Sequence, residues 1–504
     1  MVGVPRSSGC GLCLRRRVKC DEARPACANC SKYGQPCPGY EKPIKFVAGK
    51  HAVRPRRSRQ QRVQMSQVPF GNRHQDGTVS AEAGPSSDGD GGDHLVSLLT
   101  SEHVRRHLEL QAVAVFPDLG VNRAQFVSTL IDSISRDQSA AEVAFFRPWF
   151  RLVPERLGTK ATLDSAMCAL TLHLLGKSKA DGRLISQSRM LYGQSIQALQ
   201  QALNHPSEWR TAETLCTATL LCFYELFAGT TSHAAWMAHA QGVSRVIQLR
   251  GPDAYMTDRF DKMLLLAFRA IIIMNAMFSL QDCFLAQKPW QKVLQHVSAD
   301  LEIQTIPPEF VPAIDAYFRN LVMIPSFVRR LITMRIAKDH GVPHGPAQVA
   351  ALRRDAEEQL LKERAWYASI KNTLLPPPRE VPSRDPTSPF ATVLRHENQW
   401  AGSIQMNHWA NTLILQGTIN ECGGHAEDFR PLNRVFADNI FRSVELVGQG
   451  LMGPLRCSYP LRIAYEFSTL DIRRWIGRVV SGFEPRYAAT SVKDYPEAIQ
   501  ERFA

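Results

Sequence analysis

Residues 10–40 read CGLCLRRRVKCDEARPACANCSKYGQPCPGY, and this stretch decides the fold of the N-terminal region. The pattern C-x2-C-x6-C occurs twice in it, offset by 17 residues. The six cysteines are Cys10, Cys13, Cys20, Cys27, Cys30 and Cys37. Zinc in a structural site takes four ligands, so six thiolates can hold two zinc ions only if two sulfurs bridge both metals. The spacing therefore predicts a binuclear zinc cluster with two Zn²⁺ per chain.

The internal repeat also indicates which sulfurs bridge. The symmetric choice is the first cysteine of each half, Cys10 and Cys27. We expect one zinc to be held by Cys10, Cys13, Cys20 and Cys27. We expect the other to be held by Cys10, Cys27, Cys30 and Cys37.

A disulfide framework is the alternative reading of six close cysteines, and it is typical of small secreted domains. The first ten residues, MVGVPRSSGC, contain no apolar stretch of signal-peptide length, so we expect no export. The other six cysteines are scattered singly among apolar residues, as free core cysteines are in a reducing compartment. Zinc is therefore favoured over disulfides.

Basic residues are concentrated in the first half of the repeat. Between Cys13 and Cys20 four of six residues are cations: Arg15, Arg16, Arg17 and Lys19. The matching stretch of the second half, residues 31–36, contains only Lys32. This asymmetry predicts that the first half faces a polyanion, with a short helix presenting its cations to the major groove of DNA.

Net charge separates the predicted zinc-cluster domain, residues 1–40 and called the head below, from the rest of the chain. Residues 1–73 contain 16 Lys+Arg and 3 Asp+Glu, a net charge of +13, which equals the net charge of the whole chain. The basic character therefore belongs to the head and the tail that follows it, as binding to phosphates requires.

The head resembles the fungal six-cysteine zinc-cluster transcription factors, in which a basic run lies between the second and third cysteines. Further residues in step with that family are Asp21, Pro25, Gly34, Gly39 and Tyr40. The resemblance implies that Arg17 reads bases, that Arg15, Arg16 and Lys19 contact phosphates, and that the sites contain CGG-like triplets. Two departures are Leu14, where the family has arginine, and Arg17, where it has lysine.

Residues 41–94 are predicted to form a basic and then low-complexity disordered linker. Its first part holds a nuclear-import candidate, formed by Arg54, Arg56, Arg57, Arg59 and Arg62. Its second part, residues 75–93, is rich in Gly, Ser and Asp and lacks residues for a core. No sustained heptad pattern precedes Leu95, so a homodimer through a coiled coil is not evident.

Residues 95–504 are predicted to form a large all-helical regulatory domain, which makes the fold class mainly α. In the segment 184–203 apolar residues recur at helical spacing. Similar segments are 97–116, 160–176, 209–228, 233–250, 310–339, 346–374 and 433–450. The proline-rich stretch 376–389 predicts an exposed loop.

A second resemblance, to the fungal-specific regulatory domain, rests on residues 239–252, HAQGVSRVIQLRGP. Arg250, Gly251 and Pro252 are suited to ending a helix. Arg269 and Trp290 also stand where that domain has them, and Pro460 adds weaker agreement.

Other functions are disfavoured. The apolar segment 263–280 has Arg269 near its centre, so it predicts a buried helix rather than a membrane span. The G-x-G-x-x-G match at 448–453 lacks a surrounding βαβ unit, and neither H-E-x-x-H nor G-x-S-x-G occurs. His173 and His408 read as core histidines. We therefore expect no catalytic residues and no enzyme.

The sequence thus predicts a nuclear, sequence-specific transcription factor of RNA polymerase II type, bound to zinc and double-stranded DNA. Its expected protein partners are the transcription machinery and a nuclear import receptor, with no membrane. The family's usual targets are a biosynthetic gene cluster or a nutrient pathway, so we expect a pathway-specific activator. The compact regulatory domain favours a secondary-metabolite gene cluster as its target. The alternatives are a helical metabolite receptor or enzyme domain anchored to chromatin by the zinc head, and a purely architectural DNA binder.

Overall fold

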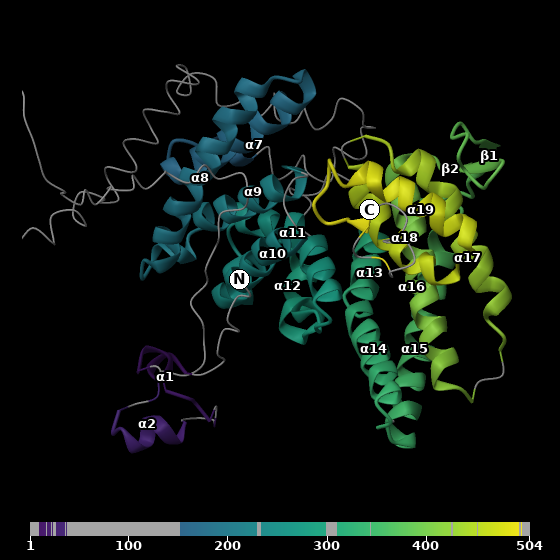
Figure 1. The fold of residues 1–504 in the computed structure, drawn as a ribbon, viewed down its shortest axis with the longest axis horizontal. Helices are drawn as coiled ribbons and strands as arrows, with labels where there is room; N and C mark the ends of the chain where they lie inside the picture. Colours follow the sequence, from purple (N-terminus) through teal and green to yellow (C-terminus); the bar gives the residue numbers. More distant parts are fainter. Residues whose placement is uncertain are drawn as a thin grey trace, which may run out of the picture.

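The computed structural model describes residues 10–16, 18–21, 23, 27–35, 37, 152–228, 233–298, 310–342, 344–424, 427–450, 452–492 and 495. Within these residues the regular secondary structure is helical apart from one two-stranded sheet (Figure 1). A mainly α fold with a separate N-terminal cysteine cluster is therefore confirmed. The predicted linker, residues 41–94, and the predicted helical segment 97–116 lie outside the described residues.

The first group of helices in the large helical domain, which the sequence predicts to be regulatory and which is called the regulatory domain below, comprises α7 (Ala161–Lys179), α8 (Gly182–Asn204), α9 (Ala212–Ala228) and α10 (His233–Arg250). α7 and α8 form an antiparallel hairpin, and Asp181 begins α8 because its carboxylate accepts the backbone N–H groups of Arg183 and Leu184. Gly176 allows the close approach of the two helices, since a Cβ there would lie 2.8 Å from Ile185. α9 is buried along its whole length between its neighbours.

The end of α10 follows the predicted pattern, with one addition. Gly251 has a φ of 78°, a region that favours glycine, and Pro252 opens a short 3-10 helix. Arg250 does more than complement the helix dipole, because its guanidinium lies 2.6 and 2.9 Å from the two carboxylate oxygens of Asp261 on the next helix. This buried ion pair fixes α10 against α11.

The middle of the domain comprises α11 (Arg259–Phe278), α12 (Lys288–Ser298), α13 (Val311–Leu321), α14 (Ile324–Asp339) and α15 (Pro346–Ile370). α11 is the buried helix predicted over 263–280, and the guanidinium of Arg269 stacks 3.4 Å above the ring of Phe318. Burial lowers the pKa of Arg269 to about 9. Among the described helices none has the length and hydropathy to cross a membrane.

The C-terminal part comprises α16 (Gln399–Cys422), α17 (Arg430–Val447), α18 (Gly453–Ala464) and α19 (Leu470–Phe483). α16 is central, since it packs against α14, α15, α17 and α18. The short 3-10 helices are η1 (Glu208–Arg210), η2 (Pro252–Tyr255), η3 (Phe284–Ala286) and η5 (Tyr465–Phe467).

A β-hairpin replaces part of the loop predicted at 376–389. β1 (Arg379–Pro382) pairs antiparallel with β2 (Thr392–Arg395), and the hairpin lies against α17. Pro382 ends β1, a position that tolerates the missing N–H of proline.

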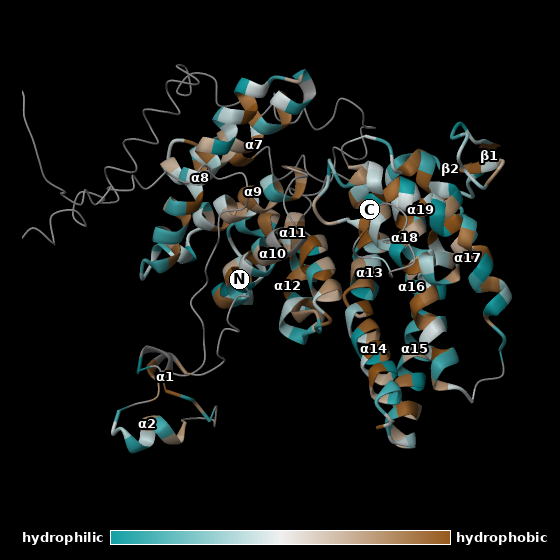
Figure 2. Cartoon of the chain, viewed as in Figure 1, coloured by the Kyte–Doolittle hydropathy of each residue, from teal (hydrophilic) through white to brown (hydrophobic). Residues whose placement is uncertain are grey.

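One contiguous core joins these helices from Leu152 to Tyr495. Hydrophobic and hydrophilic residues alternate along the ribbons of α14 and α15, as expected of helices that bury one side (Figure 2). The cysteine cluster forms a core of its own.

Candidate metal centre and nucleic-acid interface

The two halves of the cysteine repeat have the same local structure. α1 (Gly11–Arg16) begins directly after Cys10, and α2 (Ala28–Lys32) begins directly after Cys27. The backbone N–H of Cys13 donates to the sulfur of Cys10 at 3.4 Å, and that of Cys30 donates to the sulfur of Cys27 at 3.3 Å. Each helix therefore donates a backbone hydrogen bond from its first turn to the first sulfur of its own half of the repeat.

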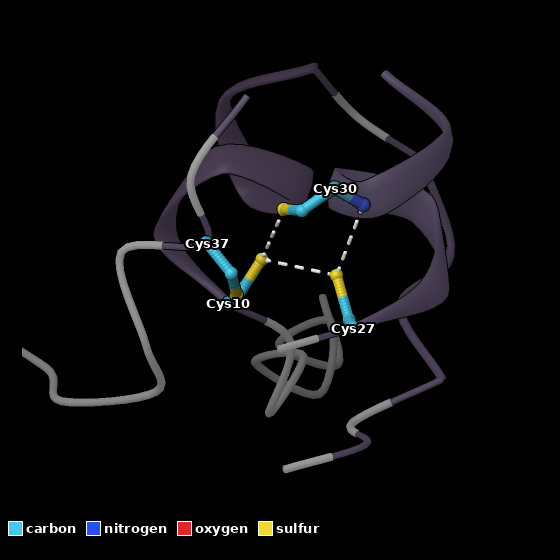
Figure 3. Close-up of side chains that lie close together, drawn as sticks. All are labelled: Cys10, Cys27, Cys30 and Cys37. Carbon is cyan, nitrogen blue, oxygen red and sulfur yellow. Dashed lines mark hydrogen bonds between the residues drawn. The ribbon is translucent and has the colours of Figure 1, made fainter. Parts of the chain in front are cut away.

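The sulfur atoms gather into two overlapping quartets. Cys10, Cys13, Cys20 and Cys27 form one, with all four ligand atoms within 4.8 Å of one another. Cys10, Cys27, Cys30 and Cys37 form the other, under the same limit (Figure 3). Cys10 and Cys27 are the members common to both quartets, the arrangement that two zinc ions sharing two sulfurs require.

The distances between sulfurs fit zinc. The Sγ of Cys10 lies 3.7 Å from that of Cys27 and 3.5 Å from that of Cys30. Two sulfurs at Zn–S distances of about 2.3 Å in a tetrahedron lie about 3.8 Å apart. None of the twelve cysteines forms a disulfide. The residues present therefore fit a zinc cluster.

The cysteine cluster needs positive charge nearby before all its thiols can lose their protons. A hydrogen bond from the backbone N–H of Cys13 lowers the pKa of the Cys10 thiol to about 6. Desolvation raises the pKa of the Cys13 thiol to about 12. Thiols this close cannot all lose their protons without compensating charge, which two zinc ions supply when bound.

Two side chains tie the halves of the head together. The carboxylate of Asp21 accepts the backbone N–H of Ala28 at 3.1–3.2 Å. The side-chain amide of Asn29 donates to the carbonyl of Lys19 at 2.5 Å. The second half thereby holds the segment that carries Lys19. The contribution of Asn29 was not predicted, because it depends on how the two halves meet in space.

The basic residues predicted to contact DNA are described only in part. Arg16 and Lys19 are exposed. Arg16 lies with its guanidinium carbon 3.5 Å from the centre of the Tyr33 ring. Arg17 and the side chain of Arg15 lie outside the described residues. So do the import candidates Arg54, Arg56, Arg57, Arg59 and Arg62.

The features of the regulatory domain that suggested other chemistry have structural roles. The Nδ1 of His408 lies 2.9 Å from the Oε1 of Glu363, and both side chains are buried in the core. In the G-x-G-x-x-G segment, a Cβ on Gly453 would lie 1.9 Å from the carbonyl oxygen of Gly448. These glycines permit the tight connection between α17 and α18.

Comparison with known families identifies both parts of the chain. Residues 8–45 match the fungal Zn(2)-Cys(6) binuclear cluster domain. Residues 124–336 match the fungal specific transcription factor domain. Both matched parts of the chain are therefore similar to domains of the fungal six-cysteine zinc-cluster transcription factors, and the cluster domain binds two zinc ions.

Individual relatives share only segments with the chain. An uncharacterized protein of Emericella nidulans is 27% identical over 184 residues, which are 36% of this chain and 39% of the relative. The transcriptional regulatory protein moc3 of Schizosaccharomyces pombe is 54% identical over 33 residues, 6% of each chain. The Zn(2)-C6 fungal-type transcription factor afumD of Aspergillus fumigatus is 53% identical over 36 residues, 7% of this chain and 9% of the relative. The matches thus span well under two thirds of these relatives, and no solved structure matches significantly.

Proposed function

We propose that this chain is a sequence-specific DNA-binding transcription factor whose head is folded by two zinc ions. All six head cysteines act as ligands, with Cys10 and Cys27 bridging. The observation that supports this most strongly is the pair of cysteine quartets that share these two residues. Catalysis has no part in this function.

The basic face of the head binds double-stranded DNA in the major groove, at CGG-like half-sites. Arg17 reads a guanine, since an arginine can donate two parallel hydrogen bonds to its O6 and N7 atoms. Arg15, Arg16 and Lys19 contact phosphates, which sets affinity and position without choosing a base. The exposure of Arg16 and Lys19 supports this assignment.

Selection of binding sites from random duplexes by the full chain tests the base-reading role. Arg17→Ala should relax the preference at one or two G·C pairs, a loss of about 1–3 kcal/mol of discrimination. Lys19→Ala is the matched control and should weaken all sequences alike, while lowering the salt slope by about one. An Arg17→Ala protein that selects the same site with unchanged stringency would show that another group reads the guanines.

The protein acts in the nucleus, imported through the five arginines between Arg54 and Arg62. Clustered positive charge is what import receptors recognise in such runs. Replacing Arg54, Arg56, Arg57, Arg59 and Arg62 with Ala should move a fluorescent fusion toward the cytoplasm. A fusion that stays fully nuclear would mean that the run only binds phosphates, or that the import signal lies elsewhere, with residues 15–19 as the next candidate.

Through its regulatory domain, the protein activates the genes of one pathway. The favoured target is a secondary-metabolite gene cluster. Deleting the gene should then lower the transcripts of one cluster of biosynthetic genes. Unchanged transcripts would favour an architectural DNA binder. Turnover or retention of a metabolite by residues 95–504 would instead favour an enzyme or a receptor.

A further inference from the structure

We propose that Tyr33 is a positioning residue for DNA binding, which holds the guanidinium of Arg16 in place across the two halves of the head. The proposal rests on the proposed function as a DNA-binding protein. The proposal adds a residue from the second half of the repeat, the half with little positive charge, to the residues proposed to contact phosphates, namely Arg15, Arg16 and Lys19.

The contact joins equivalent positions of the internal repeat. Arg16 is the third residue after Cys13, and Tyr33 is the third residue after Cys30, so the two are separated by the repeat offset of 17 residues. Arg16 ends α1, and Tyr33 directly follows α2. The two helix ends therefore meet, and the position that carries a cation in one half carries an aromatic ring in the other.

The backbone of Tyr33 is anchored, but its ring is not part of a core. The backbone N–H of Tyr33 donates to the carbonyl oxygens of Asn29 and Cys30, each at 3.1 Å. Gly34 follows with a φ of 65°, which turns the chain away directly after the ring. Tyr33 is nevertheless 52% exposed. Because the ring covers no apolar core, core packing does not explain its place.

Stacking leaves the hydrogen-bonding capacity of Arg16 intact. The guanidinium carbon of Arg16 lies over the ring of Tyr33, 3.5 Å from the ring centre, a separation that suits contact through the flat face of the guanidinium. Its N–H groups point outward in the plane of the group and remain available to a phosphate. An arginine already held by a cation–π contact loses less side-chain freedom when it binds. Tyr33 therefore raises the affinity of the head for DNA by holding the side chain of Arg16 in place.

Fluorescence anisotropy with the full-length zinc-loaded chain and its selected duplex tests this role. Tyr33→Leu keeps an apolar side chain but removes the ring face, and it should weaken binding about two- to fivefold. The slope of log affinity against log salt should stay the same, because the phosphate contact itself remains. Tyr33→Phe keeps the ring and should bind like the unaltered chain.

A double-mutant cycle decides whether the effect passes through Arg16. Arg16→Gln should lower the salt slope by about one. Adding Tyr33→Leu to Arg16→Gln should then cause no further loss. Additive effects would mean that Tyr33 contacts DNA itself, and an equal loss in Tyr33→Phe would assign the effect to its hydroxyl group; either result overturns the proposal.

Two controls separate this proposal from the function on which it rests. Every variant should bind the same number of zinc ions as the unaltered chain, and a variant with a lower zinc content would mark Tyr33 as a folding residue and reject the positioning role. If the unaltered chain binds no duplex, the DNA-binding function fails. If it binds and the cycle is additive, the positioning role alone fails.

Discussion

The described parts of the zinc head, within residues 10–37, and of the regulatory domain, within residues 152–495, bury different kinds of groups. In the head the fully buried side chains among the described residues are four cysteines: Cys10, Cys13, Cys27 and Cys30. In the regulatory domain one contiguous apolar core runs through the helices. The head therefore depends on metal–sulfur bonds for its fold, and the regulatory domain depends on the burial of apolar surface. Conditions that unfold one of the two regions should therefore leave the other region folded.

Removing zinc should produce the largest difference between the two regions. Structural zinc contributes on the order of 10 kcal/mol to the folding of small metal domains. Chelation, or Cys27→Ala, should unfold the head and abolish DNA binding. Calorimetry should show the main unfolding transition of the helical domain unchanged.

Cys422→Ala is the matched control, because Cys422 is half-buried in α16 and belongs to neither quartet. It should leave zinc content and DNA binding unchanged. DNA binding that survives Cys27→Ala would contradict the metal dependence of the head.

Breaking a polar contact in the core should affect the regulatory domain alone. Glu363→Ala leaves the Nδ1 of His408 buried without its partner, and a buried polar group without a hydrogen-bond partner costs about 1–3 kcal/mol. Denaturant unfolding followed by circular dichroism measures this loss, while the zinc content should not change. Glu358→Ala, which removes an exposed contact with Lys362 on the same helix, should leave stability unaltered. Equal effects of the two substitutions would contradict the structural role of Glu363.

Acid should destabilise the regulatory domain through His396. Its Nδ1 lies 2.5 Å from the Oε1 of Gln405, its Nε2 lies 2.9 Å from the Oγ of Ser443, and burial lowers its pKa from 6.5 to about 4. Because the unfolded chain binds the proton more readily, the stability present above pH 6.5 is lost as the pH falls toward 4.

The loss amounts to about 3 kcal/mol over that window. His396→Leu should remove this part of the pH dependence, measured by unfolding at a series of pH values. His340→Gln changes an exposed histidine and should retain it. An unchanged pH profile in His396→Leu would show that other groups cause the acid loss.

The two regions also differ in how much of them could be predicted from the sequence. The grouping of the six cysteines followed from spacing and the coordination number of zinc, because short spacings leave few arrangements. The contact of Arg16 with Tyr33 could not be predicted, since it depends on how the two halves face each other. The sequence thus predicted the grouping of the cysteines better than the contacts on the surface around them.

In the regulatory domain, the predicted amphipathic segments correspond to helices such as α8 and α10. The segment 310–339 instead forms two helices, α13 and α14. α16 was not among the predicted amphipathic segments, because polar residues such as Gln405, His408 and Asn411 are buried in it, so one apolar side does not stand out. The hairpin formed by β1 and β2 was not predicted, because the prolines in its sequence are more typical of loops.

The zinc content of the purified full-length chain, counted by native mass spectrometry, tests the central claim most directly. Two quartets that share Cys10 and Cys27 predict two zinc ions per chain. The unaltered chain should therefore carry two, and Cys10→Ala or Cys27→Ala should carry fewer. One zinc ion per chain, with DNA binding intact, would contradict the bridged cluster.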